Sequence, residues 1–200
     1  MTEFIPKYWK ILLSINLAFI FIVIGFDHHH LHDENSLLEN LQAFFLVSAT
    51  ILYFWLTSPG YESMDSRLAY MGLGLLCFSF SLREVDIEQL PVLEFIGFIF
   101  HGVGRTLLLL VLWSVFFKQV YDHCEIKLLV VKLLGFRYLQ FLNVSFLLLV
   151  AGAIFDREIW HIEHARLYEE LAETNAYLFL VIPAIYACFF KNARSRNPHP

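Results

Sequence analysis

The sequence predicts an all-α integral membrane protein, folded as one bundle of about six transmembrane helices. Hydrophobic residues make up 58% of the chain and charged residues 16%, whereas soluble domains are about 45–50% apolar and about a quarter charged. The mean hydropathy is +0.60. The ionisable residues gather between long apolar runs, whose lengths suit a hydrocarbon core of about 30 Å. No composition break divides the 200 residues, so we expect a single membrane domain.

The distribution of charge predicts the orientation of the bundle. Ten of the fourteen Lys and Arg residues lie near the two termini or in the connections at residues 58–67 and 118–137. Fourteen of the nineteen acids and seven of the nine His residues lie in or beside the other three connections. The positive-inside rule then places both termini in the cytoplasm. We expect a multi-pass protein of the bacterial inner membrane or a plasma membrane.

Six apolar segments are predicted to span the membrane: residues 11–26, 37–56, 68–82, 92–117, 138–155 and 167–190. The first is expected to be a span because it lacks the small-residue cleavage site of a signal peptide. Two interpretations stay open for residues 126–134, which contain Lys127 and Lys132. We favour an amphipathic helix at the cytoplasmic interface that ends at Gly135. The alternative is a longer, tilted fifth span.

The fourth segment carries ionisable residues deep in an apolar run. Glu94, His101 and Arg105 are seven and four residues apart, a spacing that puts them on one face of a continuous helix. An unpaired Arg near the bilayer centre costs at least about 2.5–3.5 kcal/mol. We therefore expect Arg105 to pair with a buried carboxylate, Glu173 or Glu39. Three glycines, Gly97, Gly102 and Gly104, are expected to let a neighbouring helix approach closely.

Partners for these residues are predicted on the second and sixth spans, where pairs of polar residues three apart occur. Asn16, Asn143 and Asn175 are amides at depth that are expected to bond across helices. The predicted buried polar site comprises Glu39, Gln42, Glu94, His101, Arg105, Glu170, Glu173 and Asn175. Within it, Glu170, Glu173 and His101 are the candidate catalytic residues. A structural clamp between helices is the alternative interpretation of the same residues.

Histidine is abundant in the predicted extracytoplasmic connections, and imidazole is a common metal ligand. The candidate ligands are His28, His30, His32, His161 and His164. The pattern is not specific, because no HExxH motif is present and consecutive His residues on a loop often bind metal adventitiously. The sequence identifies no particular cofactor. Cys77 and Cys188 lie inside apolar runs and are expected to be buried thiols that form no disulfide.

Several function classes lack their motifs in this sequence. There is no GxSG motif with a following His, no phosphate-binding Gly-rich loop, and no basic nucleic-acid-binding module. The favoured hypothesis is a non-enzymatic membrane subunit, sensor or scaffold that acts as an oligomer or with a protein partner. Its cytoplasmic contact with a partner or with lipid is predicted at Lys127, Lys132 and Arg137. The alternatives are a membrane-embedded hydrolase or transferase for lipids, with or without a metal, and a proton or ion pathway.

Overall fold

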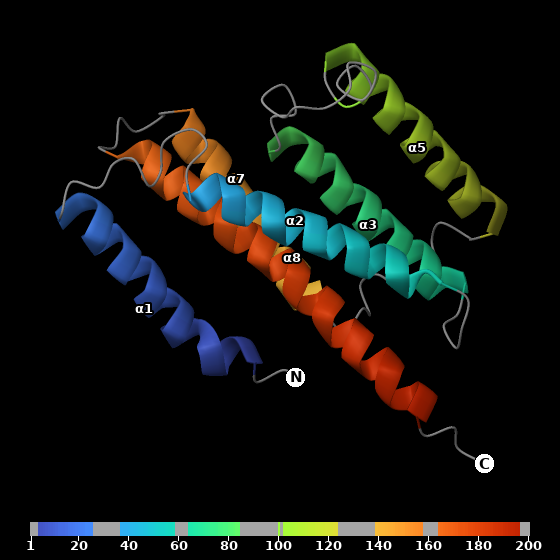
Figure 1. Ribbon diagram of the computed structural model, residues 1–200, viewed down its shortest axis with the longest axis horizontal. Coiled ribbons are helices and arrows are strands. Elements are labelled where there is room, and N and C mark those ends of the chain that lie inside the picture. Colours follow the sequence, from blue (N-terminus) through green and yellow to red (C-terminus); the bar gives the residue numbers. More distant parts are fainter. Residues whose placement is uncertain are drawn as a thin grey trace.

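The computed structural model of the chain describes residues 4–25, 37–58, 64–84, 100, 102–123, 139–157 and 164–196. Within these ranges the structure is all-helical, as predicted. Its six helices are α1 (Phe4–Gly25), α2 (Leu37–Leu56), α3 (Met64–Glu84), α5 (Gly102–His123), α7 (Leu139–Asp156) and α8 (Ala165–Arg196) (Figure 1). The helix predicted at residues 37–56 has those bounds in the structure, and α8 continues six residues beyond its predicted end.

Three helical segments are long and apolar enough to cross a membrane: Leu37–Leu56, Gly102–His123 and Ala165–Phe189. Two shorter apolar segments, Leu13–Ile22 and Gln140–Asp156, lie in α1 and α7. Large apolar side chains also point outward, among them Val103, Leu110 and Phe44, each at least 59% exposed. Soluble monomers rarely expose extended apolar faces, so these surfaces support the prediction of a membrane protein.

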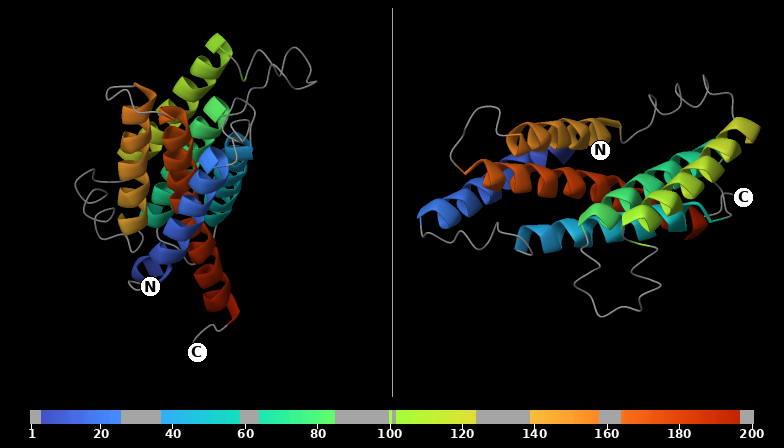
Figure 2. Two further views of the ribbon diagram at one scale, coloured as in Figure 1. Left: turned by 90° about the vertical axis from the view of Figure 1, so that its left-hand side faces the viewer. Right: turned by 90° about the horizontal axis from the view of Figure 1, so that it is seen from above.

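The helices are arranged around α8, which packs against α7 on one side and α2 on the other (Figure 2). The helix α3 packs against α2, and α5 lies at the edge of the bundle beside α3. Successive helices alternate in direction, so the start of α1 and the end of α8 lie toward the same end of the molecule. The last turns of α3 and α7 and the first turns of α2, α5 and α8 form the opposite end, which we call the polar end.

The main hydrophobic core is shared by α2, α3, α7 and α8. It contains Tyr53, Tyr70, Cys77, Phe141 and Tyr177, all of them buried. The Tyr53 hydroxyl donates a hydrogen bond of 3.0 Å to the Leu180 carbonyl, which satisfies this buried polar group between α2 and α8. Cys77 and Cys188 are both buried, as predicted for these two thiols.

The fourth predicted segment differs from the structure at Gly102. This residue has a φ of 54°, in the left-handed region, so a right-handed helix cannot continue through it unbroken. Consequently α5 begins at Gly102 rather than at residue 92; Glu94 and His101, which were predicted to share a face with Arg105, lie outside the described residues. Among the described residues, no atom of a neighbouring element lies within 4 Å of the position that a Cβ of Gly102 would take. The proposed interfacial helix at residues 126–134 lies outside the described residues.

The contact between α3 and α5 depends on a small residue at Gly72. A Cβ at this position would lie 2.9 Å from Cζ of Phe116, a buried side chain of α5. We expect Gly72→Leu to destabilise the protein by about 1–3 kcal/mol through overpacking, measured as thermal unfolding in detergent. Adding Phe116→Ala should recover part of the loss. If Gly72→Leu unfolds like the natural chain, the two helices are not packed as described.

Candidate polar site at one end of the bundle

A guanidinium group at the end of α3 binds two carboxylates at the polar end. Nη2 of Arg83 lies 2.8 Å from Oε1 of Glu173 on α8. Nε of the same residue donates to Oε1 of Glu84 at 2.8 Å. The two glutamate side chains are 13% and 11% exposed, whereas Arg83 is 53% exposed. The arrangement therefore pairs two largely buried acids with a cation that also reaches the surface.

Tyr177 completes this cluster from the next turn of α8. It follows Glu173 by four residues and therefore lies on the same face of the helix. Its hydroxyl donates to Oε1 of Glu84 at 2.9 Å and accepts from Nη2 of Arg83 at 3.2 Å. The side chain is fully buried, so these bonds satisfy a hydroxyl that would otherwise be unpaired in the core. We call Arg83, Glu84, Glu173 and Tyr177 the arginine cluster.

A second network lies one turn nearer the start of α8 and joins it to α2. Nε2 of Gln42 donates to Oε2 of Glu170 at 2.7 Å and to the Glu170 carbonyl at 3.2 Å. It also lies 3.2 Å from the hydroxyl of Thr174, which donates to the Glu170 carbonyl at 2.7 Å. Gln42 and Glu170 are both buried. The amide group is therefore the donor that compensates for burying the Glu170 carboxyl group.

The same amide has an unsatisfied oxygen. Oε1 of Gln42 is buried and has no hydrogen-bond partner among the described residues. Exchanging the amide oxygen and nitrogen would not help, because the oxygen would then face the Glu170 carbonyl, which is an acceptor only. The orientation found is thus the better of the two for binding Glu170, although it leaves one acceptor unpaired.

The ion pair predicted for Arg105 is not found. Its Nη1 donates to the backbone carbonyl of Leu82 at 2.8 Å, while Glu173 pairs with Arg83. The other predicted partner, Glu39, lies 3.7 Å from Nη2 of Arg166. Among the described residues Glu173 pairs instead with Arg83, which lies at the end of α3 and was not part of the predicted site.

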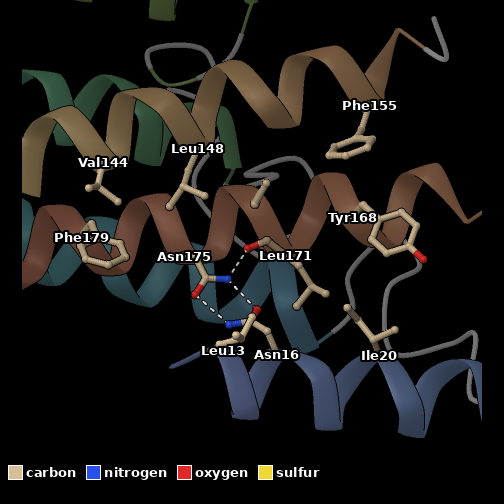
Figure 3. A pocket seen from close by; sticks show the side chains of 11 residues that line it. Leu13, Asn16, Ile20, Val144, Leu148, Phe155, Tyr168, Leu171, Asn175 and Phe179 are labelled. Carbon is tan, nitrogen blue, oxygen red and sulfur yellow. Dashed lines mark hydrogen bonds between the residues drawn. The ribbon is translucent and has the colours of Figure 1, made fainter. Parts of the chain in front are cut away.

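The amides of α1 and α8 bond to each other, as expected for polar groups at depth. Nδ2 of Asn175 donates to Oδ1 of Asn16 at 2.7 Å, and Nδ2 of Asn16 donates back at 3.2 Å. The pair lies in a groove of about 390 Å³ between α1, α7 and α8, whose other lining is almost entirely apolar (Figure 3). Asn143, the third predicted amide, is exposed on α7 instead.

The described residues provide no group of three or more His, Cys, Asp or Glu side chains that could hold a metal ion. Of the histidine candidates only His164 is described. Its φ is 62°, and its carbonyl accepts the N–H of Leu167 at 3.0 Å, so it forms the turn at which α8 begins. The other candidates His28, His30, His32 and His161, together with Glu94, His101, Lys127, Lys132 and Arg137, lie outside the described residues.

Ser79 on α3 has two hydrogen-bond partners. The Ser79 hydroxyl donates to the Leu75 carbonyl at 2.7 Å and accepts from Nε1 of Trp113 at 3.1 Å. A catalytic serine needs a general base within hydrogen-bond reach. Neither of its two partners is a base, so the contacts of Ser79 are structural.

Sequence analysis overlooked three members of the arginine cluster. Arg83 and Glu84 follow residue 82, the predicted end of the third span, and were not part of the predicted site. Tyr177 was not part of the predicted site either. The spacing of Glu170, Glu173 and Tyr177, at three and then four residues, places all three on one face of a helix. This periodicity is the signal that identifies Tyr177 as part of the site.

The Gln42–Glu170 bond gives a direct test of the second network. Gln42→Leu removes the donor and leaves the buried Glu170 unpaired, which typically costs about 1–3 kcal/mol and more for a charged group. We expect a lower melting temperature in detergent, and Gln42→Leu with Glu170→Leu should recover much of it. The matched control, Gln119→Leu on α5, should have little effect. An unchanged melting temperature for Gln42→Leu would contradict the network.

Comparison of the chain with protein-family models, with curated proteins and with solved structures finds no match. Functional inference therefore rests on the geometry of the polar end. That geometry consists of one network joining α2 to α8 through Gln42, one joining α3 to α8 through Arg83, and an amide pair joining α1 to α8.

Proposed function

We propose that the chain is a six-span protein of the inner or plasma membrane, with both termini in the cytoplasm, that acts as a non-enzymatic subunit or sensor. The observation that supports this proposal best is the pairing of polar side chains across helices at the polar end. Three separate polar contacts connect α8 to α1, α2 and α3. Groups bound to one another in this way set the relative positions of helices, which is what a sensor has to change.

The helix α8 is suited to transmit such a change. It is 32 residues long, or about 48 Å at 1.5 Å per residue, and it packs against both α2 and α7. A ligand that binds one arrangement of the polar end better than another shifts the population toward it. A displacement of Glu170 or Glu173 would be carried along α8 toward its cytoplasmic end, past Pro183, which lies inside the helix.

The surface that would receive a partner is proposed on two parts of the chain. The edge helix α5 exposes Leu107, Val111 and Val115, a face suited to lipid or to another transmembrane helix. At the cytoplasmic side we keep Lys127 and Lys132 as the proposed contact with a protein partner or with lipid headgroups, on the basis of their charge in an apolar stretch.

The proposed orientation is tested by two matched substitutions at opposite ends of the bundle. Asp122→Cys lies near the end of α5, and Asp156→Cys lies at the end of α7; both positions are exposed. In a background without the three native cysteines, a membrane-impermeant maleimide added to intact cells should label Asp156→Cys only. After the membrane is opened, both should react. Labelling of Asp122→Cys alone in intact cells would reverse the orientation.

The non-enzymatic role is tested by variants that keep the shape of the site. Glu170→Gln and Glu173→Gln can still accept hydrogen bonds from Gln42 and Arg83, but an amide cannot act as a general acid or base. We expect both variants to restore the wild-type phenotype when they are expressed in a strain that lacks the chain. A variant with reversed charges at Lys127 and Lys132 should not restore it. If either amide variant is folded, inserted at natural levels and inactive, the site is catalytic and the proposal fails.

A further inference from the structure

A second cavity lies between α3 and α5, and Arg83 of the arginine cluster forms part of its wall. Its volume is about 530 Å³, and its walls include Arg83, Arg105, Thr106, Leu109, Leu110 and Trp113. It differs from the groove beside α1 in holding charged groups. We call it the α3–α5 groove.

Among the residues that the structure describes, Arg83 and Arg105 are the charged residues that line the α3–α5 groove. The carboxylates of Glu84 and Glu173 bind Arg83, but these two residues are not among those that line the groove. Among the described residues, only the Leu82 carbonyl accepts a hydrogen bond from Arg105, and a guanidinium group has five N–H donors. Arg105 also lies in the first turn of α5, where the helix dipole adds partial positive charge. The mouth of the groove is therefore suited to an anion.

The wall of the groove becomes apolar farther along α5. Leu109, Leu110 and Trp113 follow Arg105 by four to eight residues, or about 6–12 Å along the helix. Leu110 is 59% exposed. The indole N–H of Trp113 is bound to Ser79, so the ring presents an apolar surface beside these leucines. A free inorganic anion would make no use of this surface, whereas a lipid chain would.

We propose that the α3–α5 groove binds an anionic phospholipid, with its phosphate between Arg83 and Arg105 and an acyl chain along Leu109, Leu110 and Trp113. Arginine binds phosphate oxygens through pairs of N–H groups, and a bilayer supplies both parts of the ligand. The inference deepens the proposed function and rests on its proposed orientation. That orientation places the groove in the extracytoplasmic half of the membrane, so the lipid would come from the outer leaflet. The lipid would act on the cluster that joins α3 to α8, through Arg83.

The full chain in detergent is titrated with dioctanoyl phosphatidylglycerol, dioctanoyl phosphatidylcholine or inorganic phosphate, and binding is followed by thermal unfolding. Phosphatidylglycerol should raise the melting temperature, and the other two should not. Arg105→Gln should weaken the apparent affinity for phosphatidylglycerol by about ten-fold or more, as expected for a lost charged hydrogen bond. The matched control is Arg67→Gln, since Arg67 on α3 also donates to a backbone carbonyl, that of Thr57 at 2.8 Å, at the opposite end.

A second pair of variants leaves the arginines in place. Thr106 is exposed on the wall of the groove, so Thr106→Glu should fold and abolish phosphatidylglycerol binding by repulsion, while Thr106→Gln should retain it. With Trp113 as the remaining tryptophan, phosphatidylglycerol with brominated chains should quench its fluorescence more than brominated phosphatidylcholine does. The proposal is overturned if both lipids raise the melting temperature equally, or if inorganic phosphate alone binds. It is also overturned if Arg67→Gln and Arg105→Gln weaken the affinity for phosphatidylglycerol equally. These binding measurements do not use the cellular rescue assay. If that assay shows the polar site to be catalytic, the proposed function fails, but the lipid-binding proposal is still tested separately.

Discussion

Four polar side chains that lie within two turns of α8, Glu170, Glu173, Asn175 and Tyr177, determine how the other helices pack on it. A polar group removed from water without a partner costs several kcal/mol, so each of these residues has to bond to another helix. Gln42 binds Glu170, Arg83 binds Glu173 and Tyr177, and Asn16 binds Asn175. The positions of α1, α2 and α3 relative to the first half of α8 are each constrained by one of these bonds, whereas α7 packs there through contacts such as the ring contact of Phe155 with Tyr168.

The strength of this constraint differs between helices, because apolar packing supports some bonds more than others. The helices α2 and α3 share the large core around Tyr53 and Cys77 with α8. In contrast, α1 contributes only partly buried side chains, Phe19 and Ile20, to a small cluster on α8, and a groove of about 390 Å³ lies beside it. The reciprocal amide pair therefore contributes a larger part of the packing energy of α1 on α8 than the polar bonds contribute for α2 and α3.

The arginine cluster connects two parts of the molecule with different character. On one side, Glu173 and Tyr177 belong to the central helix and are largely or fully buried. On the other side, half-exposed Arg83 lines the α3–α5 groove at the edge of the bundle. A charge that enters the groove acts on the same guanidinium group that binds Glu173. This shared residue is the physical link between the proposed lipid site and the helix proposed to transmit a signal.

Sequence composition and spacing predicted a helical bundle and three of the polar residues of α8 that bond to other helices, Glu170, Glu173 and Asn175. Apolar run length, charge distribution and the burial of Cys77 follow from local composition and from the energy of transfer into an apolar environment, which do not depend on neighbouring helices. The choice of partner was decided only by the tertiary structure. Glu173 pairs with Arg83 rather than Arg105 because of the order in which the helices pack. The end of α3 reaches α8, whereas α5 packs on α3 and lies farther from α8. Likewise, α5 begins at Gly102, inside the fourth predicted segment, and this residue has a left-handed φ. Glycine is compatible with left- and right-handed conformations, so composition does not distinguish them.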